Sequence, residues 1–221
     1  MTLAAIAVLA IAAGFFIGSI PFGYLVGRFF FGIDIRTHGS GNIGAANALR
    51  TLGKPGAGLV LLLDLLKGLL PVLAARLLHV RPEITAGVAA AAVCGHCISP
   101  WLRWRGGKGV ATSLGSIIAL SWQAGAICVG GWFVGAVLTA FSSVGSILAN
   151  VLAPFALWFT THQPAFAAYG VFAALLILYT HRENIARIRA GTENALAFLR
   201  PWRRRPQTRA PKSAMRIERG L

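Results

Sequence analysis

Three short polar segments interrupt the long apolar runs of this chain, at residues 39–50, 103–112 and 180–187. They combine glycine, serine, asparagine, lysine, arginine and histidine. These residue types hold phosphate groups through backbone N–H groups, hydroxyls and fixed positive charge. We interpret the first, second and third polar segments as parts of one phosphate site.

The first polar segment is rich in glycine, which permits backbone conformations closed to other residues. Ser40 and Asn42 add hydrogen-bond donors without adding charge, and Arg50 ends the segment with a cation. This composition predicts an anion-binding loop in which Ser40, Asn42, Gly44 and Asn47 face the substrate. An ordinary flexible turn between helices is the alternative.

The second polar segment contains Gly106-Gly107-Lys108-Gly109 at the start of a predicted helix. Backbone amides, a helix dipole and one lysine share a phosphate in loops of this kind, so we expect these four residues to bind substrate. The full nucleotide-binding pattern is absent, and we therefore exclude nucleotide hydrolysis. A positively charged flank of a membrane helix is the alternative.

The third polar segment contains His181 and Asn184, which are three residues apart and share one face of a helix. The Asn184 amide is therefore expected to orient the imidazole or the substrate. Histidine has the side-chain pKa nearest neutrality, which makes His181 the candidate base. A histidine that only meets lipid headgroups is the alternative.

Other polar residues lie within or beside the apolar runs. Asp64 and Lys67 are one helical turn apart, and intramembrane charges cost several kcal/mol unless they are paired. Mutual neutralisation inside a helix bundle is the simplest account of this pair. Ser143 is expected on the same side as the polar segments, where it lines the site or caps a helix.

The elements that position these residues are predicted to be membrane helices, because 56% of the 221 residues are hydrophobic and only 12% are charged. A bilayer core of about 30 Å requires roughly 20 helical residues per span, and backbone satisfaction in lipid requires an all-α bundle. We predict seven transmembrane helices, or six if the fourth and fifth form one span. The expected spans are residues 3–28, 56–78, 84–101, 110–122, 124–141, 144–161 and 165–180.

The distribution of charge predicts the orientation and the partners. With the N-terminus outside and the C-terminus cytoplasmic, the polar segments lie on the cytoplasmic side, as the positive-inside rule requires. Of the 21 Lys and Arg residues, 11 follow Thr180, which indicates contact with anionic lipid headgroups and not with nucleic acid. We expect a membrane domain over residues 1–200 and a basic, disordered tail over residues 201–221.

The three cysteines lie in apolar runs and are expected to be buried thiols. Cys94 and Cys97 have the spacing of a thiol–disulfide oxidoreductase but occupy an apolar helix without a βαβ context. No second ligand pair has a spacing suited to a metal. We therefore expect neither a metal nor a cofactor.

The three polar segments, in this order, resemble the motifs of the bacterial acyl-phosphate:glycerol-3-phosphate acyltransferase family, known as PlsY. The resemblance covers residues 10–194 and departs at Ala46, where the family often has threonine before Asn47. The matching motifs are Gly18-Ser19-Ile20-Pro21-Phe22-Gly23-Tyr24, Ser40-Gly41-Asn42-Ile43-Gly44, Asp64 to Gly68, Gly106-Gly107-Lys108-Gly109-Val110-Ala111-Thr112 and His181-Arg182-Glu183-Asn184-Ile185.

The resemblance implies an enzyme of the bacterial inner membrane that transfers a fatty acyl group from acyl phosphate to the 1-hydroxyl of glycerol 3-phosphate. The products are lysophosphatidic acid and phosphate, in the first step of phospholipid synthesis. The positions that it marks for catalysis or substrate binding are Ser40, Arg50, Lys108, His181 and Asn184. It associates the glycine-lysine loop with the glycerol phosphate and Glu183 with local integrity.

The chemistry agrees with these residue types. Acyl phosphate already carries a good leaving group, so the protein has to supply charge and orientation: Arg50 and Lys108 can hold two phosphates, and loop amides can stabilise the oxyanion. Either His181 or a substrate phosphate takes the hydroxyl proton. None of the five histidines has the following aspartate that the other large glycerol phosphate acyltransferase superfamily uses, so that mechanism is excluded.

Two other functions explain part of the pattern. Polar loops and the intramembrane pair Asp64 and Lys67 also occur in transporters for organic phosphates, although the charges here gather on one face. A non-catalytic scaffold leaves the glycine-lysine and histidine-asparagine pairs unexplained.

We expect the enzyme to be a monomer.

Overall fold

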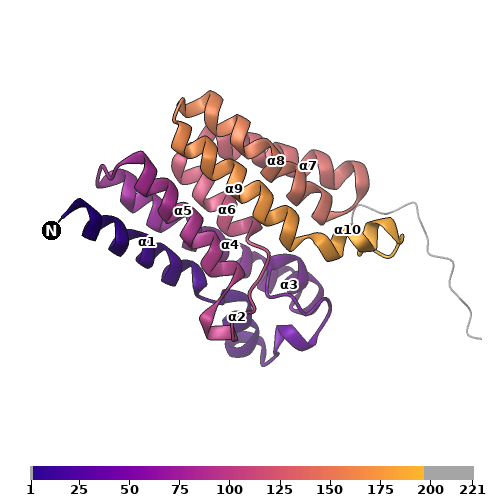
Figure 1. The fold of residues 1–221 in the computed structure, drawn as a ribbon. Helices are drawn as coiled ribbons and strands as arrows, with labels where there is room; N and C mark the ends of the chain where they lie inside the picture. Colours follow the sequence, from indigo (N-terminus) through magenta and orange to yellow (C-terminus); the bar gives the residue numbers. More distant parts are fainter. Residues whose placement is uncertain (1, 197–221) are drawn as a thin grey trace, which may run out of the picture.

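The computed structural model describes residues 2–196, and every regular element in that range is a helix (Figure 1). The expected tail over residues 201–221 lies outside the described residues. The α-helices are α1 (Leu3–Ser19), α2 (Phe22–Phe31), α3 (Ala45–Thr51), α4 (Gly53–Leu77), α5 (Pro82–Cys97), α6 (Val110–Leu120), α7 (Trp122–Thr139), α8 (Ser142–Thr161), α9 (Pro164–Thr180) and α10 (Arg182–Arg189), with short 3-10 helices η1 (Ile35–Thr37) and η2 (Pro100–Leu102).

The helices confirm a polytopic all-α membrane bundle. Within residues 2–196, five candidate spans are long and apolar enough to cross a membrane, with α1 and α2 counted as one, and six if the bent pair α9 and α10 is also one span. Each predicted segment coincides with a helix or helix pair. The predicted fourth span, α6, has only 11 residues, so helix length alone does not establish the predicted count of seven.

The prediction of one continuous helix over residues 3–28 was wrong, because the helix is interrupted at Ile20 and Pro21, between α1 and α2. Proline lacks a backbone N–H group and its ring clashes with the preceding helical turn. The carbonyl of Ile20 accepts a hydrogen bond of 2.7 Å from the Lys67 Nζ of α4 instead. The break therefore exposes a backbone acceptor inside the bundle.

The short helix α6 ends inside the bundle on a charged cap. At about 1.5 Å per residue it spans roughly 17 Å, about half of a bilayer core. The Arg76 Nη1 of α4 donates to the carbonyls of Ala119 and Leu120 at 2.7 and 2.9 Å. Beyond this cap lies an open cavity of about 510 Å³ with polar lining residues that include Ser121, Gln123 and Thr161. Arg76 therefore stabilises a helix end.

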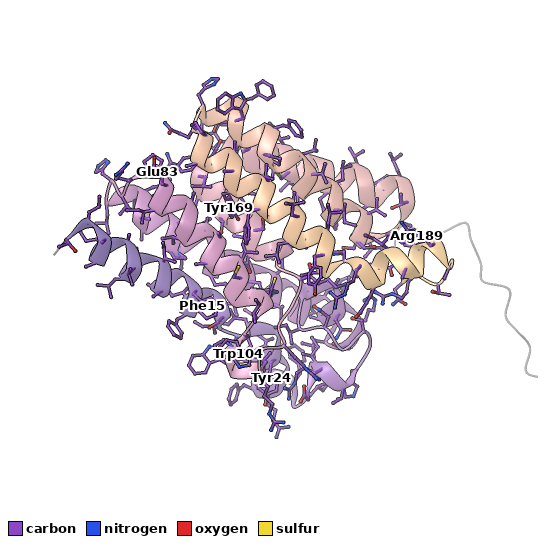
Figure 2. All side chains as sticks on the ribbon, in the orientation of Figure 1. Phe15, Tyr24, Glu83, Trp104, Tyr169 and Arg189 are labelled. Atoms are coloured by element: carbon purple, nitrogen blue, oxygen red, sulfur yellow. The ribbon has the colours of Figure 1, made fainter. Side chains whose placement is uncertain are left out.

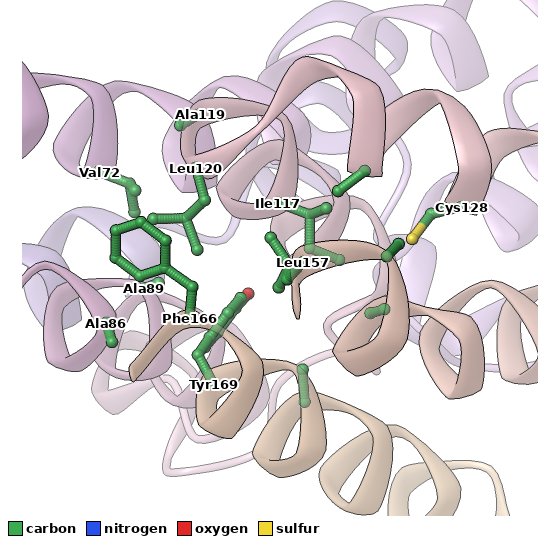
Figure 3. Packing of buried hydrophobic residues seen from close by; sticks show 14 of the residues in the cluster. Val72, Ala86, Ala89, Ile117, Ala119, Leu120, Cys128, Leu157, Phe166 and Tyr169 are labelled. Atoms are coloured by element: carbon green, nitrogen blue, oxygen red, sulfur yellow. The ribbon is translucent and has the colours of Figure 1, made fainter. Parts of the chain in front are cut away.

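The apolar core lies between α4, α5, α6, α7, α8 and α9 and depends on small residues (Figure 3). The Phe166 ring lies among Leu120, Ala86 and Ala89, where alanines leave room for it. Small side chains let membrane helices approach closely. At Gly68 of α4 a methyl group would collide with a backbone carbonyl of α6.

The polar segments gather at one end of the bundle. In Figure 1, α2, α3 and α10 lie at the end opposite the N-terminus and the α4–α5 turn. Figure 2 shows the same division, with Glu83 at one end and Arg189 at the other. The bundle therefore places all three segments where they can form one site.

Two glycines of α4 give a matched test of the close packing. We expect Gly68→Ala to destabilise the protein by about 1–3 kcal/mol, because the new methyl group meets the carbonyl of Thr112. Gly58→Ala is the control, since no atom lies within 4 Å of its added methyl group, and it should stabilise α4 by up to about 1 kcal/mol. Unfolding in a detergent titration measures both, and equal effects would contradict the packing account.

Candidate active site

The loop of the first polar segment is organised by one buried amide. Asn47 is 1% exposed, and its Nδ2 donates to the carbonyls of Ile35, His38 and Asn42 at 3.0, 3.1 and 2.8 Å. Its Oδ1 accepts from the Ser40 N–H at 2.8 Å. Asn47 therefore holds the loop closed, and its predicted contact with substrate stays a prediction.

The same loop positions a serine and an arginine. The Asn42 Oδ1 accepts from the Gly44 N–H at 2.9 Å, and the short helix α3 begins directly after Gly44. Ser40 is exposed just before this turn, and Arg50 lies in the last turn of α3. The helix therefore carries the cation toward the end of the bundle that holds the other polar segments.

The glycines of the second polar segment press against the end of α5. The N–H groups of Gly106 and Gly107 donate to the carbonyls of Cys97 and His96 at 3.1 and 3.0 Å. A side chain on either glycine would collide with His96. These two amides are therefore committed to α5, and the N–H groups left for an anion are those of Gly109 and the first turn of α6.

Lys108 joins the second and third polar segments. Its Nζ donates to the Asn184 Oδ1, and its carbonyl accepts from the Thr180 Oγ1 at 3.1 Å. Burial, followed by the charge of Arg187, lowers the pKa of Lys108 to about 8. Lys108 is therefore mostly charged at neutral pH but close to losing its proton.

Glu193, which the sequence analysis left unassigned, is the acceptor at the centre of this network. Its Oε1 accepts from the Asn184 Nδ2 at 2.6 Å and from the Ser143 Oγ at 2.8 Å, and its Oε2 accepts from the Arg187 Nε at 2.8 Å. Burial raises the pKa of Glu193, but the hydrogen bonds outweigh it and the net pKa lies below its ordinary value. The carboxylate is therefore charged and holds Asn184 toward Lys108.

His181 is oriented by the backbone and not by Asn184. The chain bends by 54° between α9 and α10, and the His181 Nδ1 lies 2.8 Å from the carbonyl of Ile177. A carbonyl only accepts, so Nδ1 carries the proton and Nε2 the lone pair. Burial, followed by the charge of Lys108, lowers the pKa of His181 to about 4, so the ring is neutral at pH 7. Of the two partners expected for the Asn184 amide, the imidazole is not the one that it contacts, since it binds Lys108 and Glu193, and its orientation of the substrate stays a prediction.

The site carries more positive than negative charge. Burial lowers the pKa of Arg50, while the charge of Glu193 raises it, which places this cation within the electrostatic reach of the network. Three cations thus lie in the field of one buried carboxylate, which Arg187 contacts directly and which acts on Arg50 and Lys108 from a longer distance. The excess of positive charge suits anionic substrates. Ser40 and Asn42 lie on the adjoining loop at the same end.

One sequence signal could have identified Glu193. The chain has only six acidic residues, and this one lies in a stretch rich in arginine, where a carboxylate readily finds partners. Glu183, by contrast, has a side chain that is 71% exposed and lies 4.0 Å from Arg187. Glu183, which the resemblance associates with local integrity, is thus much more exposed than Glu193.

The cysteines and histidines do not suggest other chemistry. Cys94, Cys97 and Cys128 are free thiols. Within residues 2–196, no group of three His, Cys, Asp or Glu side chains is arranged to hold a metal ion.

Comparisons with known proteins give a consistent result. The sequence model of the family described as Glycerol-3-phosphate acyltransferase matches residues 8–191. The glycerol-3-phosphate acyltransferase of Rubrobacter xylanophilus is 44% identical over 186 residues, which are 84% of this chain and 93% of that protein. That of Mesorhizobium japonicum is 43% identical over 189 residues, which are 86% and 95% of the two chains.

Two solved structures share the fold. Crystal structures of PlsY, an integral membrane glycerol 3-phosphate acyltransferase, have TM-scores of 0.82 in the glycerol 3-phosphate form and 0.80 in the lysophosphatidic acid form. Their sequences are 33% and 32% identical to this chain, and the alignments cover 87% of it and 96% of each crystallised chain.

The two glutamates give a prediction about the network. We expect Glu193→Ala to destabilise the protein by roughly 2 kcal/mol or more, because three donors, two of them neutral and one charged, lose their acceptor. Glu183→Ala is the control, and removal of this exposed side chain should change stability by no more than about 0.5 kcal/mol. Detergent unfolding curves measure the difference, and a larger effect at Glu183 would refute the assignment of Glu193.

Proposed function

Since the chain belongs to the PlsY-type family of glycerol-3-phosphate acyltransferases, which use acyl phosphate and produce lysophosphatidic acid, we propose that its reaction takes place at the polar end of the bundle. The observation that carries this proposal is the network from Lys108 through Asn184 to Glu193. It joins the second and third polar segments and lies within the electrostatic reach of Arg50 on the first.

Lys108 and Arg50 each bind one of the two substrate phosphates. Lys108, steered by Asn184, binds the phosphate of glycerol 3-phosphate, and Arg50 binds that of the acyl donor. The N–H groups of Gly109 and the first turn of α6 add donors for an anion, since the first amides of a helix have no intrahelical partner. Ser40 and Asn42 add neutral hydrogen bonds from the adjoining loop. Ser143 acts indirectly, because its hydroxyl donates to Glu193.

The acyl transfer needs orientation more than a strong base. The substrate hydroxyl attacks the acyl carbonyl carbon, the bond from that carbon to the phosphate oxygen breaks, and phosphate leaves. With its lone pair on Nε2, His181 accepts a hydrogen bond from the attacking hydroxyl. Because the pKa of His181 is lowered to about 4, a substrate phosphate, whose second pKa is about 6, is the stronger final acceptor of the proton.

The orientation in the membrane follows from the same geometry. We propose seven crossings, with α6 as a short one, so that the N-terminus lies outside and the polar end of the bundle faces the cytoplasm. The Arg76 cap and the polar cavity support a helix that ends within the membrane. The basic residues beside the polar segments favour the cytoplasmic side of a bacterial inner membrane.

The transporter alternative loses its main support. Its strongest feature was the charged pair in the bilayer, but the Lys67 Nζ lies 2.8 Å from the Asp64 Oδ1 with both side chains buried. These charges neutralise one another, as the sequence suggested, and do not line a route for an organic phosphate.

The role of Lys108 predicts a pH profile. A lowered lysine pKa means that the charge is lost as pH rises through about 8, so kcat/KM for glycerol 3-phosphate should fall above that pH. Lys108→Met should raise KM for glycerol 3-phosphate about 30-fold, equivalent to roughly 2 kcal/mol for a charged hydrogen bond. In this variant the fall in kcat/KM above about pH 8 should disappear. Exposed Lys54→Met is the control. A parental KM and profile in Lys108→Met would remove Lys108 from the site.

Two substitutions of His181 separate orientation from proton transfer. We expect His181→Ala to lower kcat on the order of 10²-fold, with the fold retained. His181→Gln should recover part of the activity, because an amide oxygen accepts a hydrogen bond but does not take a proton. Steady-state kinetics on purified protein measure both, and a glutamine variant as inactive as the alanine variant would make the imidazole the base.

A further inference from the structure

A buried ionic cluster lies beneath the active site and has no place in the reaction described above. It consists of Asp64 and Lys67 of α4 and His96 of α5, with side chains that are no more than 3% exposed. The Lys67 Nζ is 2.8 Å and the His96 Nδ1 3.7 Å from the Asp64 Oδ1. Lys67 and His96 therefore both face one carboxylate oxygen of Asp64 inside the bundle, Lys67 as an ion pair and His96 at a longer distance.

On one side the cluster reaches the break between α1 and α2. The Lys67 Nζ donates to the carbonyl of Ile20 at 2.7 Å and lies 5.7 Å from the centre of the Phe22 ring. The helix break at Pro21 takes this carbonyl out of the regular helical hydrogen bonding, and it also accepts from the Phe22 N–H at 3.1 Å. The ammonium group therefore ties the first span to α4 at the level of the cluster.

On the other side the cluster reaches the glycine-lysine loop. The carbonyl of His96 accepts from the Gly107 N–H at 3.0 Å, and the ring lies against the same glycine, because a methyl group there would collide with the His96 Nε2. Lys108 is the next residue of the chain. Movement of the His96 ring would therefore move the residue that precedes the phosphate-binding cation.

Stability alone does not account for such a cluster. Desolvation of two charges is expensive, and well-packed hydrophobic residues in place of a buried ion pair are often neutral or stabilising. Ionisable residues inside a membrane bundle are instead functional by default. The contacts with Ile20 and Gly107 indicate what that function is, since they join three separate elements to the loop.

We propose that Asp64, Lys67 and His96 are positioning residues that fix the glycine-lysine loop, and hence Lys108, at the phosphate of glycerol 3-phosphate. Asp64 and Lys67 set the height and rotation of the His96 ring, and the ring supports Gly107. The cluster touches no substrate and acts through Lys108. This inference rests on the proposed role of Lys108 as the phosphate-binding cation.

Two variants test this role. His96→Leu removes the link to the loop and leaves the ion pair, and the double variant Asp64→Asn with Lys67→Met removes both charges together, so that neither is left unpaired. We expect each to raise KM for glycerol 3-phosphate at least tenfold with a melting temperature near that of the parent. The fall in kcat/KM near pH 8 should move to higher pH, because a displaced lysine is better solvated.

The controls distinguish failure of this inference from failure of the proposed site. Cys94→Ala, two residues from His96 on the same helix, should keep KM within twofold of the parent. Lys108→Met is measured beside the cluster variants: if it leaves KM unchanged, the proposed role of Lys108 fails. If it raises KM while a folded cluster variant keeps the parental KM and pH profile, only the positioning role fails. If neither cluster variant folds, the cluster is a structural requirement of the bundle and the positioning role is overturned.

Discussion

The buried carboxylate of Glu193 is the interaction on which the polar end of this bundle depends. Arg50, Lys108 and Arg187 would repel one another at the edge of an apolar bundle if no anion lay among them. Glu193 accepts from Arg187, Asn184 and Ser143, which come from two different helices, and Asn184 in turn accepts from Lys108. One anion thus fixes several donors and still leaves a net positive charge for the substrates.

The apolar part of the protein serves this arrangement by rigid packing. Glycines bring helix backbones into contact, so that α4 supports α6 and the end of α5 supports the second polar segment. The carbonyls of His96 and Cys97 bind Gly107 and Gly106, which makes Lys108 the tip of a loop anchored on a transmembrane helix. Preorganised donors of this kind do not have to reorganise when charge develops in the reaction.

Much of this was predictable from the sequence, for identifiable reasons. Long apolar runs determine the helices with little ambiguity, and the three polar segments stand out because they interrupt those runs. Pro21 alone does not predict the break between α1 and α2, because membrane helices tolerate proline. The fourth span remained ambiguous because Arg76, which caps the short helix α6, lies more than 40 residues from the helix end that it binds.

The fine structure of the site was not predictable in the same way. Helical spacing suggested that Asn184 orients either the His181 imidazole or the substrate, but the chain bends by 54° between α9 and α10 and the amide contacts Lys108 and Glu193. The amides of Gly106 and Gly107 looked free for an anion, yet they bind α5, and Asn47 proved to be the centre of its own loop. In each case a contact beyond the residue's own helical turn, which residue spacing does not encode, decides where a polar group points.

The most direct test of a single site made of three segments is a structure of this protein with bound glycerol 3-phosphate. The account predicts that the ligand phosphate lies within hydrogen-bonding distance of the Lys108 Nζ, and that the glycerol lies within reach of both His181 and the loop that carries Ser40. A phosphate held by one polar segment alone, or bound in the cavity beside Arg76 at the opposite end of the bundle, would contradict it.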